Sequence, residues 1–231
     1  MAGSVGRAPG GWKGRARAAP PAAGAQAHDA SRAAGAAVGR GAMRFDEGSA
    51  SCLVYTFKEG MLSAVAHDLK VRVGRFTIEI DGLEAGAPSA LRASFETGSL
   101  RVECSMKNGS EQPGQPGDGD RRKIEQAMSE SVLQPGRWPV ARYEVSELPG
   151  ASEWVKTEAG ALVLDGRLTL AGVERPLGCA VRRERGAWVV EAEVNQTHFG
   201  IRPFTAALGT LRVKPVVRVR VEVPYAVPGP S

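Results

Sequence analysis

Residues 211–223 read LRVKPVVRVRVEV, in which aliphatic and charged residues alternate almost throughout. Successive side chains of a β-strand point to opposite faces of its sheet, so this pattern places Val221 on one face and Arg220 on the other. One apolar and one charged face are typical of an antiparallel sheet that packs only one side on a core. Pro215 lacks the amide hydrogen that a strand ladder needs, and it indicates an edge or a bulge at that position.

Most of the chain after residue 43 shows the same period of two. Residues 165–181, DGRLTLAGVERPLGCAV, predict two half-buried strands joined by a short turn that contains glycine. In residues 68–81, DLKVRVGRFTIEID, the apolar positions change parity at Gly74, which predicts a β-bulge. About eight strands can be counted in this way, and the bulge together with the long final strand favours a barrel over a sandwich.

A single segment has the period of a helix. In residues 121–133, RRKIEQAMSESVL, the positions i, i+3, i+4 and i+7 hold Ile124, Ala127, Met128 and Ser131. Residues 105–120 before it are rich in glycine, proline and polar side chains and predict a long loop. The predicted fold class is all-β, an antiparallel β-barrel of about eight strands with one mid-chain helix.

The first 42 residues differ in composition from the rest. They are rich in alanine, glycine, arginine and proline and contain almost no large apolar side chain. Such a segment cannot offset its ordering entropy by burial, so we expect residues 1–42 to be a disordered tail. The barrel domain is then expected to comprise residues 43–231, with Met43 as a candidate translation start.

The formal net charge of +5 lies entirely in this tail, which has six basic residues and one acidic residue. Totals of 30 basic and 25 acidic residues leave 24 of each for the remainder. The domain therefore has no basic excess with which to neutralise a phosphate backbone, and we expect no nucleic-acid partner. The sequence has neither a long apolar run nor the apolar core of a signal peptide, which predicts no integral membrane segment and a cytoplasmic location.

Three cysteines, Cys52, Cys104 and Cys179, are far apart in the sequence. An odd number without any Cys-x-x-Cys spacing argues against a disulfide framework or a zinc site. Cys52 shares a strand face with Val54 and Cys179 shares one with Leu177, so both are expected to be small buried hydrophobic residues. This pattern fits a reducing compartment.

His67 and Asp68 are the first polar residues whose side chains could take part in catalysis or metal binding. With His198 they would form a catalytic dyad or a metal site, whereas the simpler interpretation has them satisfy backbone groups where a strand begins. Glu191 and Glu193 share a strand face and would suit an acid and base pair, although a solvated face explains them better. We expect no catalytic residue, no metal and no cofactor.

The apolar strand faces remain as a candidate site. A barrel with many valine, leucine and alanine positions need not fill its own interior, and an apolar interior suits a hydrophobic ligand. The residues that we expect to contact such a ligand are Phe76, Ile78, Leu168, Leu170, Trp188 and Val190.

Four blocks of sequence resemble, in order and spacing, the YceI-like family of lipid-binding proteins. They are AVAHDLKVRVGRF at 64–76, IEQAMSESVLQPGRWPVARYEV at 124–145, DGRLTLAGVERPL at 165–177 and THFGI at 197–201. The resemblance runs from about Gly48 to Val223. It implies a lipocalin-like antiparallel barrel that binds a polyisoprenoid or a fatty amide, with His67, Asp68, Phe199 and Gly200 as family landmarks. The absence of a clear export signal, the AHDL sequence and the polar insertion after Cys104 depart from the family pattern.

The leading hypothesis is a non-enzymatic protein that buries the apolar tail of an amphiphilic lipid, of isoprenoid or fatty-acyl type, with the headgroup at the mouth. One alternative is a small metal-dependent hydrolase that uses His67, Asp68 and His198. Another is a stress-associated scaffold with a filled barrel and a protein partner. A homodimer is one assembly that we consider for the domain.

Overall fold

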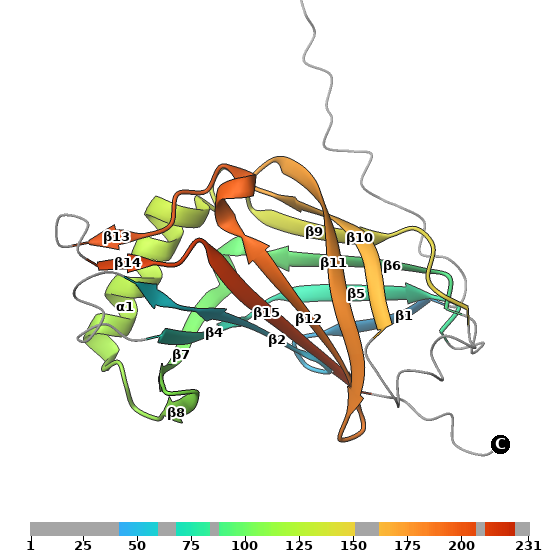
Figure 1. Cartoon of the computed structure of the whole chain (residues 1–231), viewed down its shortest axis with the longest axis horizontal. Helices are drawn as coiled ribbons and strands as arrows, with labels where there is room; N and C mark the ends of the chain where they lie inside the picture. Colours follow the sequence, from blue (N-terminus) through green and yellow to red (C-terminus); the bar gives the residue numbers. More distant parts are fainter. Residues whose placement is uncertain (1–41, 60–67, 84–87, 151–161, 207–210, 225–231) are drawn as a thin grey trace, which may run out of the picture. The chain divides into compact units, whose positions relative to one another are not determined.

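The computed structural model describes residues 42–59, 68–83, 88–150, 162–206 and 211–224. All of these lie in the second of the two units into which the chain divides, Val38–Ser231. Twelve described strands form one antiparallel sheet, and three short strands form a second small sheet (Figure 1). The tail expected at residues 1–42 lies almost entirely outside the described residues, which begin with the first strand at Ala42.

The strands of the large sheet are β1 (Ala42–Asp46), β2 (Ser51–Thr56), β4 (Asp68–Val73), β5 (Phe76–Asp81), β6 (Ala90–Glu96), β7 (Leu100–Lys107), β8 (Ser110–Gln112), β9 (Val140–Val145), β10 (Leu162–Leu170), β11 (Val173–Glu184), β12 (Ala187–Asn195) and β15 (Val216–Pro224). The small sheet contains β3 (Lys58–Glu59), β13 (Thr205–Ala206) and β14 (Leu211–Val213). The order in the large sheet is β1-β5-β6-β9-β10-β11-β12-β15-β2-β4-β7-β8.

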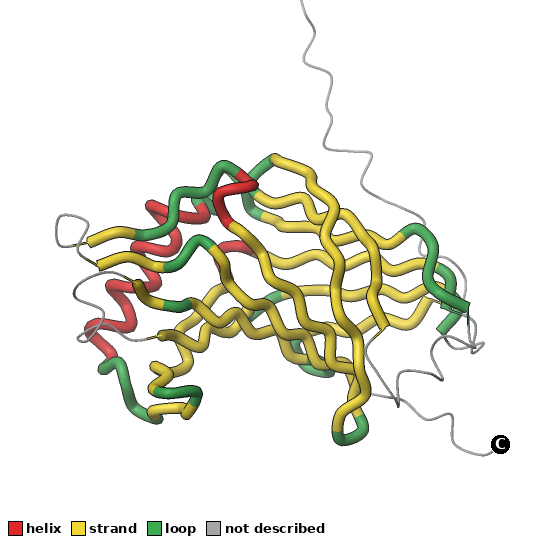
Figure 2. The backbone as a smooth tube through the Cα atoms, viewed as in Figure 1, coloured by secondary structure: helices red, strands yellow, loops and turns green. Residues whose placement is uncertain are grey.

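Three short connections force the large sheet to curl. Residues 47–50 join β1 to β2, residues 74–75 join β4 to β5, and the 3₁₀ turn η1 (Thr97–Ser99) joins β6 to β7. The first three strands of the order are β1, β5 and β6, and the ninth to eleventh are β2, β4 and β7. Each short connection therefore joins a strand near one end of the order to a strand near the other end. Because one residue spans at most about 3.6 Å, the two ends of the order must lie close together. The sheet therefore wraps around an interior, and its curvature can be followed in Figure 2.

The prediction of about eight strands was wrong: the large sheet has twelve. The runs 43–56, 68–81 and 90–107 each break into two strands at a bend, and β8 is an additional strand. The parity change at Gly74 marks one of these bends, whereas the register shift of β4 lies between Lys70 and Val71. The amide of Gly74 donates to the Ser99 carbonyl at 3.0 Å, and a Cβ at residue 74 would lie only 2.8 Å from that oxygen.

The hairpin predicted at residues 165–181 is confirmed as β10 and β11. Ala171 and Gly172 form its turn, with φ values of 49° and 75°. Strand β12 follows directly and pairs with both β11 and β15. The alternating residues of β15 place Val217, Val221 and Val223 in the core, as the sequence pattern predicts.

The mid-chain helix is also confirmed. It begins at Asp118 as α1 (Asp118–Ala127), continues as the π-helical η2 (Met128–Leu133), and ends at Gln134 in the left-handed conformation. The segment before it is more ordered than the predicted loop, because β8 pairs with β7 around Asn108 and Gly109. In the described parts of the chain, no helix is long and apolar enough to cross a membrane.

The core lies on the concave side of the large sheet, where the apolar residues of the alternating strands meet. Cys52 is 1% exposed and Cys179 is 5% exposed, which confirms the expectation that both are buried. All three cysteines are unpaired thiols. Phe76 packs against Phe95 with the ring centres 6.0 Å apart.

Candidate ligand-binding cavity

A cavity of about 1120 Å³ lies inside the curled sheet. Its wall is formed by the concave faces of the strands and, at one end, by α1 and η2. Aliphatic side chains predominate in this wall. The volume lies slightly above the range of small-molecule sites, which is about 300–1,000 Å³.

Strands β12 and β15 show how the wall is built. Trp188, Val190, Ala192 and Val194 line the cavity from β12, and Val217, Val219, Val221 and Val223 line it from β15. The ladder sets these residues opposite one another, for example Val190 with Val221 and Ala192 with Val219. Because a strand rises about 3.3 Å per residue, the four valines of β15 extend over roughly 20 Å. The cavity is therefore long, and its wall along β12 and β15 is apolar.

Five of the six residues expected to contact a ligand line this cavity: Ile78, Leu168, Leu170, Trp188 and Val190. Phe76 is only 5% exposed and belongs to the core, but it is not among the lining residues. Its ring lies beside Phe95, next to the bend at residues 74–75. Contact of any of these side chains with a ligand stays a prediction.

Three uncharged polar residues of the wall are bonded to backbone. The Tyr143 hydroxyl lies 3.0 Å from the Leu164 carbonyl oxygen and 3.1 Å from that of Leu177. The Thr97 hydroxyl donates to the Trp138 carbonyl at 2.6 Å, and the Gln196 amide donates to the Lys214 carbonyl at 3.3 Å. These hydrogen bonds are made within the wall, so these three groups leave no unpaired polar atom towards the interior.

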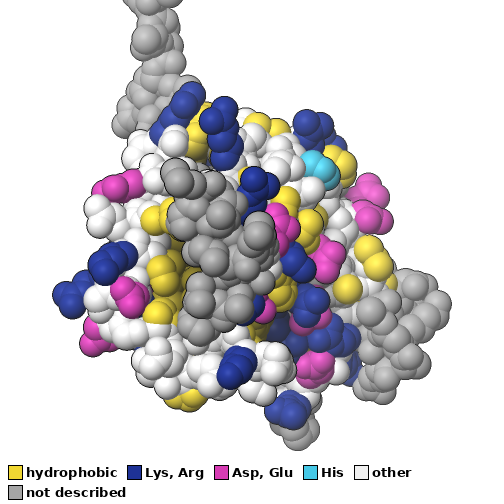
Figure 3. Space-filling model, turned by 60° about the vertical axis from the view of Figure 1, so that its left-hand side comes forward, with side chains coloured by type: hydrophobic (Ala, Val, Ile, Leu, Met, Phe, Trp, Pro, Cys, Tyr) yellow, Lys and Arg dark blue, Asp and Glu magenta, His cyan; other side chains and the backbone are white. Residues whose placement is uncertain are grey.

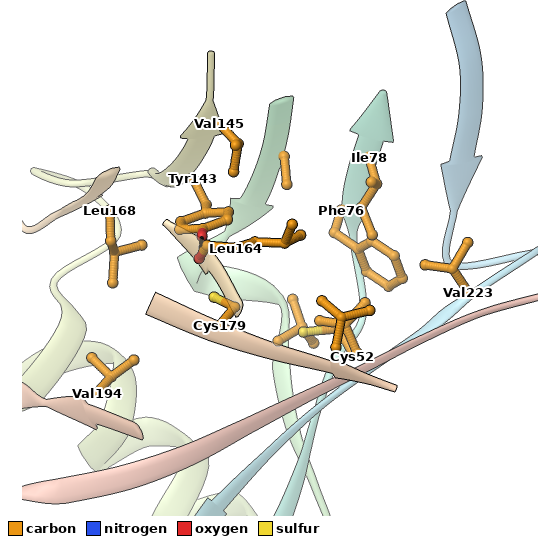
Figure 4. Close-up of a cluster of buried hydrophobic side chains, with 14 of the residues drawn as sticks. Cys52, Phe76, Ile78, Tyr143, Val145, Leu164, Leu168, Cys179, Val194 and Val223 are labelled. Atoms are coloured by element: carbon orange, nitrogen blue, oxygen red, sulfur yellow. Dashed lines mark hydrogen bonds between the residues drawn. The ribbon is translucent and has the colours of Figure 1, made fainter. Parts of the chain in front are cut away.

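Tyr143 reaches these carbonyls because residue 166 is glycine. A Cβ at Gly166 would lie 2.5 Å from the Tyr143 hydroxyl oxygen and 2.7 Å from the Glu144 carbonyl oxygen. Tyr143, Leu164 and Cys179 lie together in Figure 4. Burial raises the pKa of the Tyr143 hydroxyl far above its usual range, so this group stays protonated and acts as a structural donor.

Two of the buried thiols also line the cavity, Cys52 and Cys179. Burial raises the pKa of Cys52 to about 12, and it raises the pKa of Cys179 as well. A thiol is nucleophilic only as the thiolate, so neither side chain is activated at neutral pH. They act as small apolar residues of the wall.

The helical end of the cavity is lined by Ile124 and Ala127 of α1 together with Met128, Val132 and Leu133 of η2. The expected site residues did not include them, although the helical spacing at 124–128 put apolar side chains on one face. Phe204 lines the cavity near the small sheet and is 37% exposed. Figure 3, which brings the left side of Figure 1 forward, shows hydrophobic side chains among acidic and basic ones on this face.

Four cations are among the lining residues: Lys58, Lys123 and Arg212, and also Arg183, which lies at the end opposite the helix. Arg183 of β11 pairs with Trp188 of β12 in the ladder, beside the turn at Arg185 and Gly186. Both side chains line the cavity, and the Arg183 guanidinium carbon lies 4.6 Å from the centre of the Trp188 ring.

The Asp68 side chain binds a backbone amide. Its Oδ1 atom accepts a hydrogen bond from the Lys58 amide at 2.8 Å, where β4 begins. His198 is exposed, with Nε2 3.4 Å from the Asn195 side-chain nitrogen. His67 lies outside the described residues, and within those residues no group of three or more His, Cys, Asp or Glu side chains is placed to hold a metal ion.

The other singled-out residues also have structural partners. Phe199 is 4% exposed in the core, and Gly200 ends the 3₁₀ turn η4 (Gln196–Phe199) with φ of 72°. Glu191 accepts hydrogen bonds from Arg182 at 2.8 Å and Arg220 at 2.9 Å on the convex face. These bonds lower the pKa of Glu191, with that from Arg182 the stronger, whereas Glu193 is 70% exposed.

Fold and site together define an all-β protein whose curled antiparallel sheet encloses a long apolar cavity.

No protein-family model and no curated protein matches the sequence. Among solved structures, a polyisoprenoid binding domain from Saccharophagus degradans implicated in plant cell wall breakdown is similar at 12% identity and a TM-score of 0.47, over 79% of this chain and 98% of that one. BcnA of Burkholderia cenocepacia is similar at 10% identity and a TM-score of 0.46, over 77% of this chain and 97% of that one. A mutant CJ YceI protein is similar at 11% identity and a TM-score of 0.41, over 68% and 84%. The third of these structures carries the name YceI, which is also the name of the family that the four sequence blocks resemble.

Proposed function

We propose that this protein binds an amphiphilic lipid, of isoprenoid or fatty-acyl type, inside a lipocalin-like barrel without reacting with it. The observation that carries the proposal is the cavity of about 1120 Å³ with its aliphatic wall. Removal of apolar surface from water contributes about 25 cal/mol per Å². A chain that lies in the cavity contacts the apolar side chains of many strands. The resemblance of the sequence to YceI-like proteins implies the same class of ligand.

The shape of the cavity supports a chain more than a compact ligand. Its wall follows β15 for roughly 20 Å, and the Tyr143, Thr97 and Gln196 groups are bonded to backbone. A long tail without polar groups suits such an interior, because a polar group within it would lose its hydrogen bonds to water. The presence of this cavity argues against the alternative of a stress-associated scaffold with a filled barrel.

The proposal is tested by native mass spectrometry of the full chain purified without detergent, followed by organic extraction. We expect an adduct that the solvent releases as a long-chain lipid. An apo mass, together with failure of the protein to take up isoprenoid and fatty-acyl probes, would refute the proposal.

A matched pair of variants tests whether the lipid binds inside the cavity. Ala192 lines the cavity from β12, whereas Ala180 of the neighbouring β11 is absent from the cavity lining and pairs with Glu191. Ala192→Trp places an indole in the cavity, and we expect at least a tenfold loss of probe affinity, about 1.4 kcal/mol. Ala180→Trp adds the same group outside the cavity and leaves the affinity unchanged. Equal effects of the two substitutions would place the ligand elsewhere.

A further inference from the structure

The helical segment formed by α1 and η2 closes one end of the cavity without burying its own residues. Ile124, Ala127 and Met128 line the cavity from this segment. No residue of α1 or η2, all of which the structure describes, is buried. Val132 and Leu133, near the end of η2, pack against the buried core of the sheet. The first part of the segment therefore turns its apolar face towards the empty space of the cavity.

The chain on either side of this segment is fixed to the sheet. Before α1, the Ser105 amide of β7 donates to the Gln115 carbonyl at 2.6 Å. After η2, the Thr97 amide of η1 donates to the Pro139 carbonyl at 2.9 Å, and the Thr97 hydroxyl donates to the Trp138 carbonyl at 2.6 Å. These two anchors leave α1 between them as a unit that can tilt away from the sheet.

Glu125 joins α1 to the edge of the large sheet between the two anchors. Its Oε1 atom accepts a hydrogen bond from the Val102 amide of β7 at 2.8 Å. Val102 is 3% exposed, and β8 pairs with β7 at residues 105–107, beyond this position. An amide that is buried without an acceptor is costly, so this bond stabilises the position of α1 that the structure shows.

The cavity reaches the surface of the protein beside α1. Asp120 and Lys123 both line the cavity, and their side chains are 69% and 80% exposed. Phe204 also lines it and is 37% exposed. A displacement of α1 would therefore widen an existing contact with solvent and would not require a strand of the barrel to separate.

The strands of the wall are held more firmly than α1. Val190 of β12, for example, is paired with Val181 on one side and with Val221 on the other. Segments with few buried apolar contacts open locally at a lower free energy than paired core strands. A hydrocarbon chain in the cavity would lie against Ile124 and Met128 and supply apolar contacts that the empty cavity lacks, so occupation should favour the closed position.

We propose that α1 is the gate through which the lipid enters and leaves the cavity, and that the bond between Glu125 and the Val102 amide is its latch. When this bond breaks, α1 tilts between its two anchors and uncovers the apolar interior. The inference rests on the proposed lipid-binding function. It adds the route of the ligand and the positioning residue that controls it.

The experiment measures the association and dissociation rate constants of Nile red with the full chain by stopped-flow fluorescence. Glu125→Ala should raise both constants by the same factor, about tenfold, because the latch is a hydrogen bond to a charged group, and should leave the Kd unchanged. A side chain that only supports the wall would change the Kd instead. Unchanged rates, or a rise in the dissociation rate alone, would overturn the inference.

Two control variants separate the latch from the stability of the helix. Glu125→Gln keeps an acceptor oxygen for the Val102 amide and should accelerate exchange of Nile red less than Glu125→Ala does. Glu130→Ala removes an exposed carboxylate from the same helical segment, where it bonds to Gln126 at 3.0 Å, and should keep the natural rates. Equal acceleration in Glu130→Ala and Glu125→Ala would refute the latch.

Hydrogen exchange of the natural protein decides if Glu125→Ala does not fold. Without lipid, the amides of α1 should exchange at least about tenfold faster than those of β12, and palmitate should slow them. Equal protection of α1 and β12 without lipid would contradict a gate at α1. If neither Nile red nor palmitate binds, the proposed function fails and the inference fails with it, whereas binding with natural rates in Glu125→Ala contradicts the inference alone.

Discussion

Gly166 shows how one missing side chain shapes the cavity wall. The Tyr143 hydroxyl occupies the space above it and reaches two backbone carbonyls of β10 and β11. Gly166→Ala would set a methyl group 2.5 Å from that hydroxyl and 2.7 Å from a backbone oxygen. We expect a loss of about 1–3 kcal/mol in the free energy of unfolding, measured by urea denaturation.

Gly178 provides the control for this substitution. It lies on the adjacent strand of the same hairpin, and a Cβ there would meet its nearest atoms at 3.4 and 3.5 Å, an ordinary contact. Gly178→Ala should therefore change the free energy of unfolding by less than about 0.5 kcal/mol. If both variants lose the same stability, the Tyr143 contact is not the cause.

Variants of Asp68 distinguish a structural role of this side chain from a metal-binding role. Asp68→Ala removes the acceptor of the Lys58 amide, and we expect a loss of about 1–2 kcal/mol in stability. Asp68→Asn keeps an acceptor oxygen and should restore most of it. Metal analysis of untagged protein is expected to give the same result for all three proteins, and near-stoichiometric metal lost only in the variants would contradict this assignment.

At the scale of elements, strands β11, β12 and β15 are linked on their convex face by ion pairs. Arg220 bonds to Glu184 at 2.7 Å and to Glu191 at 2.9 Å, and Arg182 bonds to Glu191 at 2.8 Å. Hydrogen bonds from Arg220 and then Arg182 lower the pKa of Glu184 from 4.5 to about 2. The folded state therefore favours the ionised carboxylate more than the unfolded state does.

This network predicts acid sensitivity with a defined sign. The stabilisation is complete above the unfolded pKa of 4.5 and is lost as the pH falls towards about 2. Melting temperatures across this window should fall more steeply for the natural protein than for Glu184→Gln. Glu193→Gln, at a side chain 70% exposed and 4.0 Å from Arg218, should keep the natural slope. Identical slopes for the natural protein and Glu184→Gln would exclude this origin of the acid sensitivity.

The elements that the sequence predicted best are those in which one face is core and the other is solvent. The residues of β12 and β15 and the β10–β11 hairpin follow this rule, because the alternation reports burial directly. The bends at 47–50, 74–75 and 97–99 each contain one glycine, but they were not predicted as breaks, because a single glycine also fits a bulge within one strand. Alternation also does not say which apolar residues border empty space, and so Phe76 and Ile78 could not be distinguished.

Arg183 and the apolar face of α1 were missing from the expected site for different reasons. Parity along β11 already places Arg183 on the same face as Leu177 and Cys179, so the signal was present in the sequence. The helix residues Ile124 and Met128 carry a clear apolar spacing, but their position at the end of the cavity depends on tertiary packing. Local periodicity contains no information on that packing.

At the scale of the domain, the cavity couples ligand binding to stability. A ligand that binds only the folded state, at about 100 times its Kd, adds about 2.7 kcal/mol, and for a domain of this size we expect a rise in melting temperature of about 5–10 °C. Differential scanning calorimetry with palmitate or farnesyl phosphate measures the shift. Ala192→Trp should abolish it and Ala180→Trp should not, whereas a shift that survives in Ala192→Trp would place the ligand outside the cavity.

The position of β15 in the strand order has a consequence for the synthesis of the protein on the ribosome. β15 lies between β12 and β2, so β2 has no complete neighbour on that side until residue 222 has been added. At about 5–20 residues per second, a ribosome needs roughly 8–30 seconds to proceed from β2 to β15. For that time the new chain displays the unpaired edge of an apolar strand, and the cell must keep it from the edges of other nascent chains.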